Sequence, residues 1–151
     1  MNKKIKIITI LGVVLFVSLV AFSFYYRYTT EQKIIRNLNL RAEEFINKWG
    51  NYTNSSSTEY LNLLAPYLSK GQYSATEKEA GTIREYINSG YEPNTSKVIV
   101  RDCSTTKRPE GYESHCNIEQ EIVSYKKTNL KMYIFWKRID QEYLIENWYT
   151  E

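Results

Sequence analysis

The chain has 151 residues, of which 42% are hydrophobic, 15% aromatic and 25% charged, and its formal net charge is +3. Lys3, Lys4 and Lys6 carry that excess, because the rest of the sequence holds 17 basic and 17 acidic residues. Nucleic-acid binding needs a basic footprint, so this balance argues against nucleic acid as a partner. The length after the N-terminal segment suits one ordinary domain.

Residues 7–26 form an apolar run of twenty residues without a charge. As a helix this run would span roughly 30 Å, the thickness of the hydrocarbon core of a bilayer. Lysines precede it, and Tyr25, Tyr26 and Tyr28 close its far end, which predicts one membrane span with a cytoplasmic N-terminus. We therefore expect a basic cytoplasmic tail (1–6), a transmembrane helix (7–26), a stalk or start of the first domain helix (27–34) and an extracytoplasmic domain (35–151) at the cell membrane.

A cleaved signal peptide is the alternative interpretation of this segment. Ala21-Phe22-Ser23 fits a small-x-small cleavage site. The run is longer than the apolar core of about 7–15 residues that signal peptides use, and the aromatic residues that follow suit a membrane interface. Both interpretations export the rest of the chain.

Helical periodicity continues after the apolar run. Thr29-Thr30 can cap a helix that starts near Glu31, has an apolar stripe on one face and stops at Gly50. The alternative is that this stripe continues from the membrane helix as a stalk and then docks on a sheet. A capping box at Ser56 predicts a second, short helix that Pro66 breaks. A second box at Ser74 predicts a third helix that ends after Asn88. The apolar stripe of the first helix comprises Ile35, Leu38, Ala42, Phe45, Ile46 and Trp49; the buried side of the third comprises Ala80, Ile83, Tyr86 and Ile87.

The remaining sequence alternates with a period of two and predicts four strands. We expect these strands at 97–103, 116–125, 130–139 and 142–149. The segment Ser104–His115 is polar, contains Pro109 and Gly111, and is predicted to be a loop. The third and fourth strands are apolar on both faces, which predicts helices on one side and another surface on the other.

Cys103 and Cys116 are the only two cysteines, and both lie in the exported part. In an oxidising compartment a disulfide is the leading interpretation, with two free thiols or a metal or redox site as alternatives. The bridge would staple the predicted loop, so we take Lys107, Arg108, Tyr112 and His115 as candidate recognition residues. A lone histidine is usually a surface or structural residue, and the alternative is that Asp102 and His115 pair across the hairpin.

Three helices followed by long, aromatic-rich strands resemble the cone-shaped nuclear-transport-factor-2-like, or cystatin-like, fold. The resemblance rests on residues 42–52, on Leu61-Asn-Leu-Leu-Ala-Pro-Tyr-Leu68 and on Glu146-Asn-Trp-Tyr149. Membrane-anchored proteins with this domain look similar, among them the bitopic scaffold component of type IV secretion and conjugation machines. The resemblance implies an α+β domain with three helices packed on a curved antiparallel four-stranded sheet, and partners within an envelope assembly.

Enzymes of this fold place carboxylates and tyrosines inside the cone, so Trp49, Tyr133, Tyr143 and Glu146 are candidate pocket residues. Against an enzyme, the sequence has no phosphate loop, metal-ligand cluster or nucleophile signature, and we expect no catalytic residue, metal or cofactor. The leading hypothesis is a non-enzymatic, membrane-tethered domain that binds a protein partner or itself. The alternative is a small-molecule-binding or enzymatic cone with a pocket between the sheet and the first helix.

Overall fold

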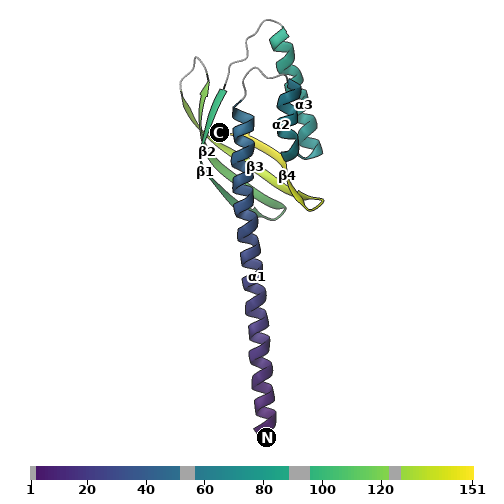
Figure 1. The fold of residues 1–151 in the computed structure, drawn as a ribbon, viewed down its shortest axis with the longest axis vertical. Helices are drawn as coiled ribbons and strands as arrows, with labels where there is room; N and C mark the ends of the chain where they lie inside the picture. The colour runs from purple at the N-terminus through teal and green to yellow at the C-terminus, as the bar shows by residue number, and fades with distance from the viewer. Residues whose placement is uncertain (1–2, 52–56, 89–95, 123–126) are drawn as a thin grey trace. The chain divides into compact units, whose positions relative to one another are not determined.

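The computed structural model describes residues 3–51, 57–88, 96–122 and 127–151, with side chains for 11–51, 58–79, 97–121 and 127–151. The chain divides into two compact units, residues 1–35 and 36–151. The predicted α+β class is confirmed. In chain order the elements are α1 (Lys3–Gly50), α2 (Ser57–Leu64), the 3-10 helix η1 (Ala65–Tyr67), α3 (Lys70–Asn88), β1 (Ser96–Arg108), β2 (Gly111–Ile122), β3 (Thr128–Ile139) and β4 (Glu142–Thr150) (Figure 1).

One continuous helix, α1, covers both the apolar run and the apolar stripe, which is the stalk alternative of the sequence analysis. The hydroxyls of Thr29 and Thr30 do not cap a new helix but donate to the carbonyl of Tyr26, at 3.0 and 2.8 Å. This back-bonding keeps both threonines inside a continuous helix. The described residues therefore form three α-helices and one 3-10 helix, and α1 ends at Gly50 as predicted.

Within the first unit, the described side chains of residues 11–28 of α1 are all exposed. Its most apolar window of 18 residues has a mean hydropathy of 1.6, and none of that window is buried inside the chain. Phe24 and Tyr25 are 70% and 67% exposed. By length and composition this helix suits a membrane span, and a signal sequence has the same features.

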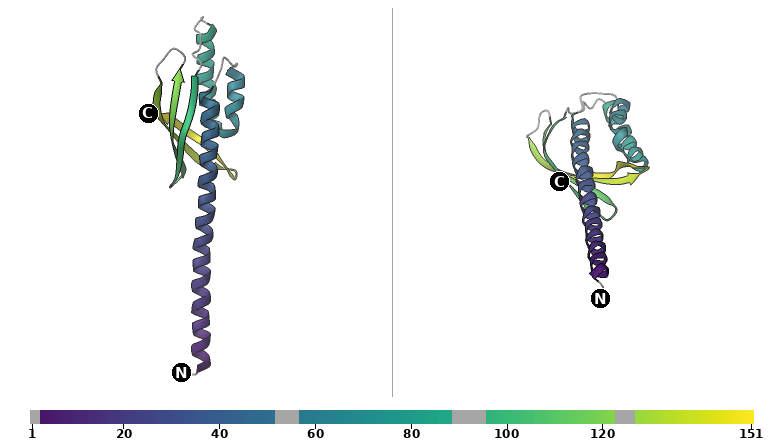
Figure 2. Two further views of the ribbon diagram at one scale, coloured as in Figure 1. Left: turned by 60° about the vertical axis from the view of Figure 1, so that its left-hand side comes forward. Right: turned by 60° about the horizontal axis from the view of Figure 1, so that its bottom comes forward.

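Within the second unit, the C-terminal part of α1 packs against a four-stranded antiparallel sheet in the order β1-β2-β3-β4. The sheet curves around that part of the helix (Figure 2). The predicted stripe is the buried side, since its residues from Leu38 to Ile46 are at most 1% exposed. Phe45 contacts Trp148 of β4 at 5.1 Å and Tyr67 of η1 at 5.9 Å between ring centroids, so the helix, η1 and the sheet share one core.

The end of α1 is fitted closely to the start of β1. A Cβ atom at Gly50 would lie 2.2 Å from Cγ2 of Val98, so this position accepts no side chain without a shift. The next residue, Asn51, donates its amide to the Val98 carbonyl at 3.2 Å and accepts from the Val98 N–H at 2.8 Å. Asn51 thus forms hydrogen bonds with both backbone groups of Val98 on β1, which is an edge strand of the sheet.

The segment Ser104–His115 is not a loop, contrary to expectation. Most of it continues β1 and β2 as a long hairpin, whose turn is formed at Pro109 and Glu110. The polarity that suggests a loop has another cause, because Thr105 and Ser114 face the core. Their hydroxyls lie 2.6 Å apart, and the Trp136 indole donates to the Ser114 oxygen at 2.8 Å.

A register shift between β3 and β4 changes which side chains of β4 share a face. Alternation from the turn would place Ile145 and Trp148 on opposite faces, but Glu146 is an extra residue between the pairs at Ile145 and Asn147. This β-bulge puts Trp148 beside Ile145 on the buried side and sends Tyr149 to the outer face.

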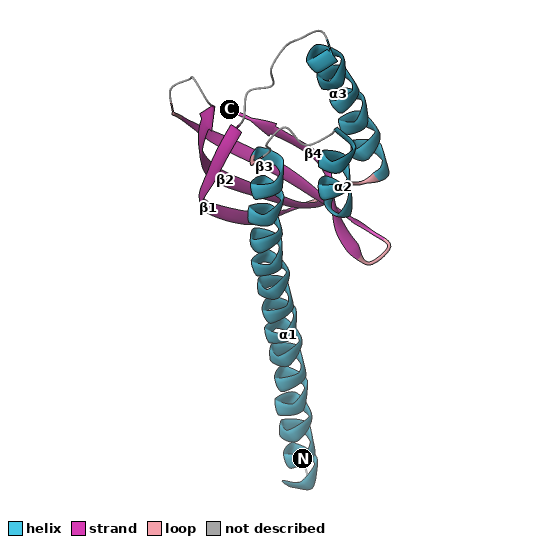
Figure 3. Ribbon diagram, turned by 45° about the horizontal axis from the view of Figure 1, so that its top comes forward, coloured by secondary structure: helices cyan, strands magenta, loops and turns pink. Residues whose placement is uncertain are grey.

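Helices α2 and α3 complete the second unit beside β4 (Figure 3). Pro66 ends α2 as predicted, and the chain passes through η1 into Leu68 and Ser69. The third helix begins at Lys70 rather than near Ser74, because Ser69 accepts a hydrogen bond from the Gln72 N–H at 3.2 Å. The predicted cap Ser56 and the buried side predicted for α3 lie outside the described side chains.

Candidate interaction surface on the outer face of the sheet

The face of the sheet that points away from α1 carries a row of rings. In the strand register His115 lies opposite Tyr133, and Tyr133 lies opposite Tyr149. The His115 and Tyr133 ring centroids are 4.8 Å apart, edge to face, and Tyr133 and Tyr149 stack at 4.8 Å. Phe135 stacks on Tyr149 at 6.1 Å. We call His115, Tyr133, Phe135 and Tyr149 the outer aromatic row.

The outer aromatic row is partly open to solvent. Tyr149 is 42% exposed and the His115 side chain 45% exposed. Stacking of Tyr133 on Tyr149, with 15° between their planes, means that the rings cover each other's faces.

Carboxylates flank the outer aromatic row at both ends. Glu113, whose side chain is only 9% exposed, pairs with Arg108 and with His115, at 2.9 Å from His115 Nε2. The Tyr133 hydroxyl donates to Glu151 at 3.2 Å. Partial burial raises the pKa of Tyr133, and the charge of Glu151 raises it further, so this phenol stays protonated and donates.

The predicted recognition residues divide between the two faces of the hairpin. Lys107 and Arg108 are exposed near the turn, and His115 belongs to the outer aromatic row. Tyr112 is 6% exposed on the helix side, where its ring meets Tyr143 edge to face at 5.3 Å. The alternative pairing of His115 with Asp102 is wrong, since the Asp102 carboxylate accepts from Asn117 at 2.8 Å.

The disulfide prediction is confirmed. Cys103 and Cys116 lie directly opposite each other in the register of β1 and β2, with their Cα atoms 4.1 Å apart, and their sulfurs are bonded. The bridge therefore joins the middle of a hairpin and does not close a loop. Cys116 is 1% exposed and packs on the core side.

The four candidate pocket residues do not line one space. Tyr143 faces the helix side, whereas Tyr133 and Glu146 lie on the outer side, where Glu146 is 3.7 Å from Lys137. Trp49 is half-buried at the end of α1, and its carbonyl accepts from the Tyr60 hydroxyl at 3.3 Å.

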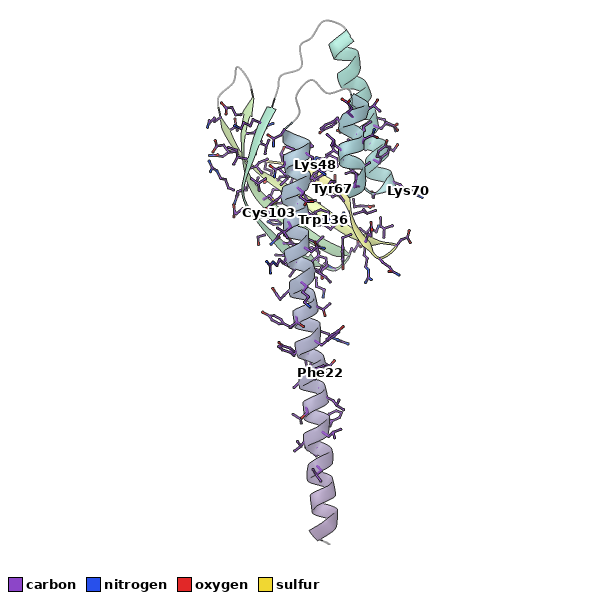
Figure 4. All side chains as sticks on the ribbon, viewed as in Figure 1. Phe22, Lys48, Tyr67, Lys70, Cys103 and Trp136 are labelled. Carbon is purple, nitrogen blue, oxygen red and sulfur yellow. A yellow bond between two sulfur atoms is a disulfide. The ribbon has the colours of Figure 1, made fainter. Side chains whose placement is uncertain are left out.

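Large side chains occupy the space between the sheet and α1. Phe45, Ile134 and Trp136 are at most 2% exposed there. Arg41 lies 5.7 Å from the ring centroids of both Tyr67 and Trp136. Tyr67 and Trp136 are labelled in Figure 4. A cleft of about 520 Å³ does occur elsewhere on the second unit, and none of the four candidates lines it; its lining is Arg101, Asn117, Ile118, Asn129, Leu130, Lys131 and Glu151.

Sequence reasoning did not select Phe135 or Tyr149 as site residues. Alternation along β3 gives a signal for Phe135, because Tyr133 and Phe135 fall on the face opposite to Trp136. Tyr149 has no such signal, since its face depends on the β-bulge at Glu146.

Comparison with solved structures shows the fold. An IcmL-like type IV secretion system protein from Legionella pneumophila superposes with a TM-score of 0.59 at 13% identity, covering 77% of this chain and 91% of that one. CagV, a VirB8 homologue of the type IV secretion system of Helicobacter pylori, superposes with a TM-score of 0.52 at 11% identity, covering 75% and 95%. No protein-family model and no curated protein matches the sequence. The chain therefore has the fold of these two proteins, as the sequence resemblance predicts.

Proposed function

We propose that this protein is a membrane-anchored scaffold whose extracytoplasmic domain binds protein partners in an envelope assembly of the type IV secretion or conjugation kind. One observation carries the proposal, namely that an unburied apolar helix runs into a domain with the fold of two type IV secretion proteins. The disulfide supports an oxidising location for that domain. The mode of action is binding, without catalysis.

Anchoring is favoured over signal cleavage by the position of the candidate cleavage site. Ala21–Ser23 lies inside α1, and cutting there would leave a new N-terminus at Phe24-Tyr25-Tyr26, in which each residue is at least 64% exposed. In water such a cluster is unfavourable, but at the headgroup level of a membrane it is the usual arrangement.

Binding is favoured over a small-molecule cone because the interior is packed and the aromatic surface faces outward. Phe45 and Trp136 fill the space in which a ligand would lie, whereas Tyr149 is open to solvent. Tyrosines combine apolar area with a polar tip, which suits protein contacts.

The test is crosslinking in native membranes followed by purification and identification of the attached proteins. We expect the wild-type chain to recover protein partners reproducibly. Tyr149→Ser should reduce recovery at least several-fold, and Thr106→Ser, on the outer face of β1, should leave it unchanged. Recovery of free monomer alone from the wild-type chain would contradict the proposal.

A further inference from the structure

The outer aromatic row ends at an edge strand of the sheet. His115 of β2, Tyr133 of β3 and Tyr149 of β4 follow one another in register, and β4 is the last strand. The ring of Tyr149 stacks on Tyr133 and remains exposed. Because cross-strand aromatic pairs stabilise sheets, a further ring on a neighbouring strand would extend the outer aromatic row.

The backbone of β4 has groups available for such a strand. Lys131 and Glu151 exchange both backbone hydrogen bonds, at 2.8 and 2.9 Å, so they form a hydrogen-bonded pair. Hydrogen-bonded and non-hydrogen-bonded pairs alternate along an antiparallel ladder. Tyr149 therefore turns its N–H and C=O toward β3, whereas Trp148 and Thr150 turn theirs toward the edge.

An extended segment of the chain itself already occupies another part of this edge. Leu68 forms a single parallel bridge with Ile145, and the Ser69 N–H donates to the Ile145 carbonyl at 2.9 Å. Among the described residues, no further backbone group pairs with this edge beyond Ile145. The C-terminal half of β4 is therefore an open strand edge, the feature to which an extended peptide adds in β-augmentation.

The charged side chains along this strand are all acidic. Residues 142–151 contain three glutamates and no lysine, arginine or histidine. Glu146 has a cation near it, since Lys137 lies at 3.7 Å. Glu151 accepts from the neutral Tyr133 hydroxyl, and among the described side chains no cation forms an ion pair with it. A basic residue on an added strand would be favourable opposite this carboxylate.

We infer that the C-terminal half of β4 binds an extended segment of another protein, antiparallel to β4, with a basic residue opposite Glu151 and an aromatic residue opposite Tyr149. Trp148 and Thr150 would each exchange two backbone hydrogen bonds with that segment. The segment is thus recognised by the pattern basic-any-aromatic along one face. The inference rests on the proposed function, to which it adds the chemical class of the partner.

The edge strands of a second copy of the chain do not fit this edge. Antiparallel pairing of two β4 strands needs a two-fold axis normal to the sheet. The C-terminal part of α1 lies along the sheet, so the second α1 would run in the opposite direction and two anchored copies could not share a membrane (Figure 2). The other edge strand, β1, has no aromatic residue to place opposite Tyr149. The partner is therefore a different polypeptide.

The probe is a synthetic peptide with the sequence of residues 128–137, Thr-Asn-Leu-Lys-Met-Tyr-Ile-Phe-Trp-Lys. It carries the required pattern, because Lys131 lies opposite Glu151 and Tyr133 opposite Tyr149 where this sequence pairs with β4 in the sheet. The labelled peptide is titrated against the full chain in detergent, and fluorescence anisotropy measures binding. We expect saturable binding, and binding at least several-fold weaker for a peptide with Lys131→Glu. In a Glu151→Lys protein the preference between the two peptides should reverse.

A pair of variants isolates the backbone contribution. Thr150→Pro removes an N–H that the sheet itself does not use, whereas Thr150→Ala removes the hydroxyl and keeps that N–H. Thr150→Pro should weaken binding of the probe at least several-fold relative to Thr150→Ala. An intact Cys103–Cys116 bridge, checked by mass spectrometry, shows that each variant is folded.

Three results would overturn the inference: no saturable binding of the probe, equal binding to Thr150→Pro and Thr150→Ala, or the same peptide preference in the wild type and in Glu151→Lys. If one of these occurs while crosslinking in membranes still recovers protein partners, the proposed function stands and its interface lies elsewhere. If that recovery also fails, both are wrong.

Discussion

At the residue scale, the polar triad in the core decides how the first hairpin is built. Ser114 is fully buried and satisfies both the Trp136 indole and the Thr105 hydroxyl. Each of these groups would otherwise be buried without a partner, which is costly. The triad therefore explains how a polar stretch becomes part of the edge strand β1 and the central strand β2.

Ser114→Ala should destabilise the protein by about 1–3 kcal/mol, because it leaves the indole N–H of Trp136 and the Thr105 hydroxyl without their partner. Ser104→Ala, an exposed serine on the adjacent strand, is the control and should change stability by less than about 0.5 kcal/mol. Chemical denaturation of the full chain in detergent measures both. Equal effects of the two substitutions would show that the triad contributes nothing.

Ion pairs on the surface of the domain make its stability depend on pH in the acidic range. Hydrogen bonds from Arg101 and Lys127 hold the pKa of Glu119 below its ordinary value of 4.5. Because the folded pKa is the lower one, the stabilisation is present above pH 4.5 and is lost as the pH falls through the folded value. Glu119→Gln should therefore lose less stability than the wild type between about pH 5 and pH 3. Superimposable pH profiles in denaturant titrations would refute this role.

At the element scale, the contact between the end of α1 and the start of β1 positions the helix on the sheet. Gly50→Ala should cost about 1–3 kcal/mol, since its Cβ would collide with Val98. The same substitution in a Val98→Ala background should cost less, because the nearest atom, Val98 Cγ2, is gone and only the Cβ of residue 98, at 2.6 Å, still collides. A double-mutant cycle gives the coupling energy, and strictly additive effects would argue against the close fit.

The disulfide links the two strands of the hairpin that β1 and β2 form. Replacing Cys103 and Cys116 together by alanine should destabilise the domain by about 3 kcal/mol, because the bridge restricts the unfolded chain. Thermal unfolding should give similar Tm values for the reduced protein and the double variant. Both Tm values should be lower than that of the oxidised protein. A variant as stable as the oxidised protein would contradict this.

The sequence predicts the elements best where alternation and turns agree. The predicted strand 142–149 differs from β4 by one residue, and Asp140 and Gln141 form the expected turn with φ angles of 48° and 78°. The sequence predicts least where contacts between residues distant in the chain determine the structure. The polar face of the first hairpin is buried only because Trp136 supplies a donor, and the outer aromatic row exists only because register and a β-bulge align residues from three strands.

At the scale of the whole molecule, the chain combines an apolar helix with an α+β domain whose outer face carries aromatic residues. In the proposed function the helix anchors the protein in a membrane, the disulfide suits an oxidising side, and the outer face offers area for partners. The proposed binding of partners therefore depends on which side of the membrane the domain occupies.

The most direct test labels Thr106→Cys with a membrane-impermeant maleimide in intact spheroplasts or protoplasts. Position 106 is exposed on the outer face of β1, so its thiol should react without lysis, on a chain of full-length mass that resists alkaline extraction from membranes. Labelling only after lysis would place the domain in the cytoplasm. A labelled but shortened, extractable chain would show a cleaved signal in place of an anchor, and either result would contradict the account.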